Sequence, residues 1–179
     1  VDRNVLDKEG KTVEDGSDAV AALRGYANSD LSNSSVILSA GMNPRLYNYL
    51  DKLSAFDLDS DGAFAKKVVV KVSDYRSALI QGKYLAKKGI WESEFRIESG
   101  LNCGGHAFAT EGFLIGPIVE EFKTNRQELI EALFEIYSAA MAKKGKGNIA
   151  VPPSVVFSVQ GGIGTHEEAE LLHNHYGIE

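Results

Sequence analysis

The stretch that decides the fold class is Lys67–Val72, with the sequence KVVVKV. Four valines in six residues predict a buried β-strand, because β-branched side chains pack well on a pleated sheet. Ser73 or Asp74 follows directly and can cap a helix that the pattern predicts from about residue 75 to 88, with Gly89 at its end. A strand that passes straight into a helix is the repeating unit of a parallel α/β sheet.

The same unit recurs on both sides of this stretch. Further strands are predicted at 36–38, 95–97 and 155–159, and further helices at 18–26, 44–53 and 166–175. Residues 112–146 are predicted to form two helices, because Thr124 or Asn125 can start the second one. This alternation indicates parallel strands with right-handed crossovers, as in a doubly wound sheet or part of a (β/α)8 barrel.

Composition excludes several classes of protein. A net charge of -6 argues against a nucleic-acid-binding surface, and 44% hydrophobic residues are typical of a globular domain with a core. The single cysteine allows no internal disulfide and fits a reducing compartment. No signal peptide or membrane span is recognisable, so we expect a cytoplasmic protein with no nucleic-acid or membrane partner.

The first candidate site is Glu98–His106, with the sequence ESGLNCGGH, directly after a predicted strand. Gly104 and Gly105 allow the backbone to turn sharply and to pass close to a flat or anionic ligand. His106 supplies the kind of side chain whose unperturbed pKa lies nearest to working pH, although a buried histidine bonded to the backbone is the alternative interpretation. Cys103 is interpreted as a small packed residue, and no metal is expected because the other histidines lie too far along the chain.

The second candidate site is the glycine-rich turn between the last predicted strand and helix, where Gly161, Gly162 and Gly164 stand. Backbone N–H groups of such a turn can bind a phosphate at the helix N-terminus, although a tight turn without a ligand is the alternative. In a parallel sheet the strand ends meet at one edge, so three further residues become secondary candidates for that edge. They are Ser39, Gly41 and Lys71.

Together these motifs resemble one known family. The block Gly100–His106, with a strand and a helix before it and a strand running into Gly161-Gly162-Ile163 after it, resembles the nitronate monooxygenase (2-nitropropane dioxygenase) family. Its members are FMN-dependent (β/α)8 barrels, and the flavin-dependent enoyl reductases share the layout. The resemblance covers roughly residues 34–177.

The resemblance implies an FMN-dependent oxidoreductase that acts on a small-molecule substrate. It implies that His106 is the active-site imidazole beside the flavin ring, where it takes or gives a substrate proton. The glycine turn at 161–164 would hold the FMN phosphate through its N–H groups. The remaining candidates would lie around the cofactor, and they are Ser39, Gly41, Lys71, Gly104 and Gly105.

Two alternatives stay open beside the nitronate monooxygenase assignment. One is an enoyl reductase that uses NAD(P)H, which the long helical insertion after His106 and the departure at Asn102 leave possible; the other is a non-catalytic flavin- or phosphate-binding domain. Four predicted strands are half of a barrel. We therefore expect residues 1–179 to be one domain, the central part of a barrel whose other strands are missing from this chain, with little activity in isolation.

Overall fold

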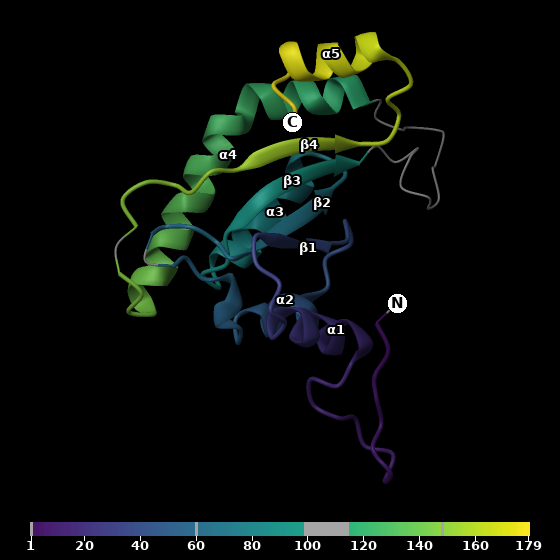
Figure 1. Cartoon of the computed structure of the whole chain (residues 1–179), viewed down its shortest axis with the longest axis vertical. Coiled ribbons are helices and arrows are strands. Elements are labelled where there is room, and N and C mark those ends of the chain that lie inside the picture. The colour runs from purple at the N-terminus through teal and green to yellow at the C-terminus, as the bar shows by residue number, and fades with distance from the viewer. Residues whose placement is uncertain (1, 60, 99–114, 148) are drawn as a thin grey trace.

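The computed structural model describes residues 2–59, 61–98, 115–147 and 149–179. In these ranges strands and helices alternate along the chain, as predicted (Figure 1). The elements are α1 (Asp18–Ala27), β1 (Ser34–Leu38), α2 (Pro44–Leu50), a 3₁₀ turn (Ser54–Phe56), β2 (Lys66–Val72), α3 (Tyr75–Ala86), β3 (Glu92–Glu98), α4 (Ile115–Lys143), β4 (Val156–Gln160) and α5 (His166–Asn174).

The four strands form one sheet in the order β1-β2-β3-β4, and every neighbouring pair is parallel. The predicted parallel α/β class is therefore confirmed. Strands adjacent in sequence are adjacent in the sheet, and the order never reverses among the described strands. A reversal is what defines a doubly wound sheet, so these four strands are wound in a single direction.

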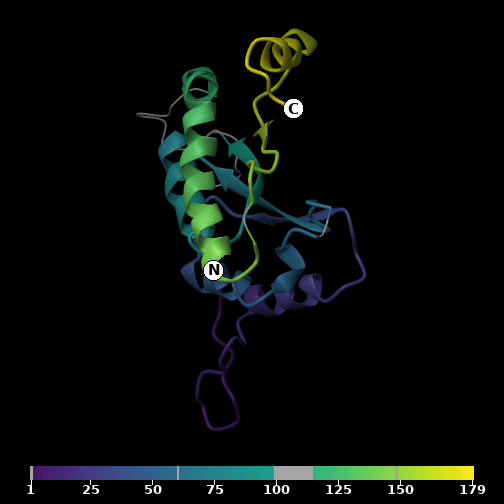
Figure 2. The same ribbon diagram turned by 90° about the vertical axis from the view of Figure 1, so that its left-hand side faces the viewer.

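One face of the sheet carries the hydrophobic core. Figure 2 shows α3 and α4 side by side on the same side of the strands. Phe157 of β4 stacks on Phe95 of β3 with ring centroids 5.8 Å apart, and Phe122 of α4 lies 5.9 Å from Phe157. We call this the covered face, and its fully buried strand residues are Leu38, Val68, Val70, Val72, Phe95, Ile97 and Phe157.

The opposite face, which we call the open face, carries most of the charged strand residues together with Ile37, Val69 and Val156. Strand residues alternate between the two faces, so the residues between the core positions share this side. Parallel strands are usually apolar on both faces because both are covered. Here, by contrast, the open face includes Lys67, Lys71, Glu94, Arg96, Glu98 and Ser158.

The prediction of two helices between 112 and 146 is wrong. A single 29-residue helix, α4, runs through Thr124 and Asn125. Its apolar stripe keeps the helical period across these residues, and packing on the sheet outweighs their preference for caps. The buried residues of the stripe are Ile118, Val119, Phe122, Leu129, Leu133, Tyr137 and Met141.

Most other element boundaries agree with prediction to within one or two residues. Helix α2 is shorter than predicted and ends at Leu50. Helix α3 ends at Ala86, and Gly89 adopts a φ of 68° in the turn that follows. That left-handed conformation suits glycine and redirects the chain into β3.

The segment after α5 returns to the free edge of β4. The backbone N–H of Glu179 donates to the carbonyl oxygen of Phe157 at 3.0 Å. The Arg126 guanidinium bonds the carbonyl oxygens of Tyr176 and Gly177 and lies 4.7 Å from the Phe157 ring centroid. The last residues therefore lie beside β4.

Among the described residues, no helix has both the length and the apolar character needed to cross a bilayer.

Candidate functional site

The candidate site is the edge at which the four strands end, which we call the carboxyl edge. It comprises Ser39–Gly41 after β1, Lys71–Asp74 at the end of β2, Glu98 at the end of β3, and Gln160–Thr165 after β4. The register pairs Val72 with Ile97 and Glu98 with Gln160, so these ends lie level with one another. Loops at this edge are where parallel sheets bind ligands.

Three of the predicted site residues, Gly104, Gly105 and His106, lie outside the described residues. Glu98 is described, and the segment that carries them follows it in sequence. Glu98, the last described residue before them, lies at the carboxyl edge between the ends of β2 and β4. The roles of the three residues stay predictions.

The glycine turn has the conformation that its sequence suggests. Gly161 and Gly162 have φ values of 85° and 77°, in the left-handed region where a side chain is strained. Thr165 caps α5 in a capping box: its hydroxyl accepts from the N–H of Glu168, whose carboxylate reaches back to the turn. The turn is exposed.

One of the three N–H groups predicted to bind a phosphate, that of Gly164, donates to a carboxylate oxygen together with the N–H of Thr165, which was not predicted. The Oε2 atom of Glu168 accepts from the N–H of Gly164 at 2.7 Å and from the N–H of Thr165 at 3.0 Å. The N-terminus of α5 thus binds a carboxylate of its own chain, that of Glu168. A phosphate bound to these two N–H groups would take the place of the Glu168 carboxylate.

Lys71 belongs to an ion pair. Its Nζ lies 2.9 Å from Oε1 of Glu98, across neighbouring strands on the open face. The Lys71 side chain is 26% exposed and that of Glu98 only 4%. Sequence reasoning proposed Lys71 but missed Glu98, although the alternation of Glu94, Arg96 and Glu98 along β3 is a signal for a charged face.

A buried glutamine, also missed from the sequence, ties two strand ends together. Gln81 of α3 donates through Nε2 to the carbonyl oxygen of Ala40 at 3.2 Å and to that of Lys71 at 3.4 Å. Its Oε1 accepts from the Tyr47 hydroxyl. Burial, followed by the nearby Glu92 carboxylate, raises the pKa of Tyr47, so this donor keeps its proton. Gln81 therefore holds the ends of β1 and β2 at a fixed spacing.

The other two secondary candidates form a local turn after β1. The hydroxyl of Ser39 donates to the carbonyl oxygen of Gly41 at 3.1 Å. A Cβ atom on Gly41 would meet nothing within 4 Å, so no packing of the described chain requires glycine there. This loop lies at the carboxyl edge, as predicted for parallel strands, but it makes no contact that identifies a ligand.

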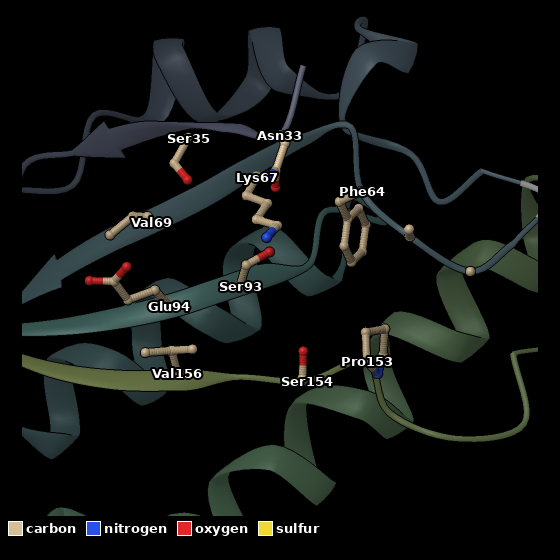
Figure 3. A pocket seen from close by; sticks show the side chains of 12 residues that line it. Asn33, Ser35, Phe64, Lys67, Val69, Ser93, Glu94, Pro153, Ser154 and Val156 are labelled. Atoms are coloured by element: carbon tan, nitrogen blue, oxygen red, sulfur yellow. The ribbon is translucent and has the colours of Figure 1, made fainter. Parts of the chain in front are cut away.

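Two of the hollows that the described residues form lie on the open face. One, of about 450 Å³, lies at the amino half of the sheet, where Lys67 extends toward Ser93 beside Glu94 (Figure 3). The other, of about 550 Å³, runs along β3 and β4 and reaches the carboxyl edge at Gln160. The second is better placed for a ligand at the candidate site, because the first lies at the opposite end of the strands.

Comparison of the chain with family models, with curated proteins and with solved structures finds no match in any of the three. The function must therefore be argued from the residues and the geometry of the carboxyl edge.

Proposed function

We propose that this protein is an FMN-dependent oxidoreductase of the nitronate monooxygenase type. The observation that carries the proposal is the convergence at one edge: Lys71, Glu98 and the Gly161–Thr165 turn lie at the carboxyl ends of parallel strands, and the segment with His106 follows Glu98 in sequence. This is where a (β/α)8 enzyme builds its active site.

Two features favour barrel units over an open sheet. The strand order is sequential without reversal among the described strands. The Glu179 N–H bonds β4 at the position where the next strand of a barrel would pair. In a closed barrel the open face becomes the interior, and its charged residues would meet side chains from the remaining strands.

The residues of the edge fit FMN. Two N–H groups of the glycine turn already converge on one carboxylate oxygen, a stand-in for a phosphate oxygen. Lys71 supplies a positive charge on the open face of the same edge. FMN, when bound, supplies the acceptor for two electrons from the substrate.

The residues of the chain handle binding and the proton. The glycine turn and Lys71 bind the anionic parts of cofactor or substrate, and Gln81 keeps the strand ends spaced. His106 takes a proton from an acidic C–H group of the substrate onto a ring nitrogen, as a base with a pKa near neutrality can do. The electron pair of that C–H bond stays on the substrate as a carbanion, so the proton is balanced by one negative charge, and FMN, when bound, would supply the oxidant for this carbanion.

One measurement tests the cofactor first. The longest natural version of the protein is purified without added flavin, and its absorbance spectrum is recorded before and after denaturation. Flavin bands with release of FMN support the proposal. A colourless protein that takes up no added FMN contradicts it and leaves a phosphate-binding α/β domain.

His106→Ala tests the catalytic role. Loss of a general acid or base is expected to lower turnover about 10²- to 10⁴-fold while FMN stays bound. Unchanged turnover would show that His106 is not catalytic. His175→Ala is the matched control, because His175 is exposed at the C-terminal end of α5, away from the glycine turn.

An enoyl reductase is the second candidate, and the 29-residue helix α4 between the His106 segment and β4 favours it. Substrate profiling separates the two activities. NAD(P)H consumption that depends on an enoyl thioester indicates the reductase, whereas oxygen uptake with a nitronate indicates the monooxygenase.

A further inference from the structure

Two ion pairs of the described residues lie on the open face, and they differ in burial and in position. Glu94 and Arg96 lie two residues apart on β3, with 2.8 Å between Oε1 of Glu94 and Nη2 of Arg96, and their side chains are 19% and 27% exposed. The Ser158 hydroxyl also donates to Glu94. Lys71 and Glu98 join two strands at the carboxyl edge, and Glu98 is almost fully buried.

A buried ion pair stabilises a fold little, because desolvation of both charges offsets their attraction. Apolar side chains of similar size would serve the fold as well at these two positions. The pair also lies at the edge where the candidate site is formed, one residue before the segment that carries His106. The position of the Lys71–Glu98 pair and its small contribution to stability both indicate a role in the candidate site.

We propose that Glu98 is a positioning residue that acts through Lys71. It holds the ammonium at the carboxyl edge and sets how much positive charge that group presents to an anionic ligand. An ammonium carries three donors, so Lys71 can keep Glu98 and still donate to a ligand. The inference rests on the proposed function, because the anion it concerns is the FMN or the anionic substrate.

The direction of the effect follows from the charges. Glu98→Gln keeps the shape and removes one negative charge beside the ammonium, so anion binding becomes tighter. Lys71→Met removes the positive charge and weakens anion binding. If Glu98 acts only through Lys71, its replacement has no effect once Lys71 is gone.

A double-mutant cycle tests this. The wild type, Glu98→Gln, Lys71→Met and the double variant of the longest natural protein are titrated with FMN, riboflavin and inorganic phosphate. Glu98→Gln is expected to lower the FMN dissociation constant about tenfold when Lys71 is present, equivalent to about 1.4 kcal/mol, and to leave it unchanged in the Lys71→Met background. An equal shift in both backgrounds, no shift, or weaker binding overturns the inference.

The controls separate folding from positioning. Lys71→Met strands a buried carboxylate and is expected to destabilise the fold, whereas the double variant removes both charges and serves as the properly folded reference. Glu94→Gln removes a carboxylate from the same strand and face. It is expected to change FMN affinity less than about twofold, because Glu94 pairs with Arg96 and not with Lys71. Circular dichroism and thermal unfolding confirm that each variant is folded.

The two proposals fail in different ways. A wild-type protein that binds no FMN overturns the proposed function. Coupling between positions 71 and 98 in the phosphate titration would then still support the positioning role toward an anion. Tight FMN binding without any coupling overturns only the positioning role. A coupling seen with FMN but not with riboflavin indicates that Lys71 faces the phosphate.

Discussion

The two faces of the sheet come from the same strands and yet have opposite chemistry. On β2, Lys66 and Lys67 are adjacent in sequence, but Lys66 is buried on the covered face whereas Lys67 extends over the open face. On β4, Phe157 packs in the core and Ser158 bonds Glu94 on the open face. The covered face contains the hydrophobic core that stabilises the fold, and the open face carries the charged side chains that reach the candidate site. Adjacent residues therefore offer matched tests.

Phe157→Ala is expected to have the largest effect on stability. The side chain is 2% exposed, stacks on Phe95 and packs at a tilt against Phe122. Truncation of a buried phenylalanine removes about 3–5 kcal/mol from the free energy of unfolding. Denaturant unfolding measures the loss. The neighbouring Ser158→Ala removes one hydrogen bond and is expected to cost about 1 kcal/mol; equal losses would contradict the division between the faces.

Lys66→Met tests a charge on the covered face. The Lys66 ammonium donates to the carbonyl oxygens of Tyr26, Ala27 and Ser29 at 2.7, 2.8 and 2.8 Å, and so caps the C-terminal end of α1. Loss of hydrogen bonds from a charged donor is expected to cost about 1.5–3 kcal/mol.

Lys67→Met is the control for this cap. Lys67 is half-buried beside the hollow of the open face and is expected to change stability by less than about 0.5 kcal/mol. Thermal unfolding of the two variants side by side decides the point. A similar loss for both would mean that the cap on α1 contributes nothing specific.

How much of this could be read from the sequence depends on the element. The strands were predictable because β-branched runs are followed by helix caps, and the parallel class followed from their alternation. The single helix α4 was not predictable. Thr124 and Asn125 are typical capping residues, but packing of an unbroken apolar stripe on the sheet favours one continuous helix. Glu98 was missed as a partner of Lys71 because a cross-strand contact depends on register, which one sequence does not specify.

Glu92 shows the same limit more clearly. Strict alternation from Glu94 predicts Glu92 on the open face. The register instead shifts between Val68 and Val69, so Glu92 pairs with Val68 while Glu94 pairs with Val69. A bulge of this kind moves every residue before it to the other face. Glu92 consequently lies in the core, 1% exposed.

This bulge creates the final test of the two faces. Among the described residues, neither carboxylate oxygen of Glu92 has a hydrogen-bond partner. Burial raises the pKa of Glu92 well above 4.5, so the folded protein keeps this proton when the unfolded chain has lost it. The folded state then binds more protons than the unfolded state, and stability falls as the pH rises above about 4.5.

Glu92→Gln removes this pH dependence and is expected to raise stability at neutral pH by about 1 kcal/mol, because an amide does not have to take up a proton on folding whereas the ionised Glu92 of the unfolded chain does. The measurement is denaturant unfolding of wild type and variant at several values of pH from 5 to 8. Their difference isolates Glu92, and it should grow with pH. The open-face counterpart Glu94→Gln removes a carboxylate paired with Arg96 and should lower stability slightly. A difference for Glu92→Gln that stays flat with pH would mean that the carboxylate is solvated in the folded protein, and that the bulge does not carry it onto the covered face.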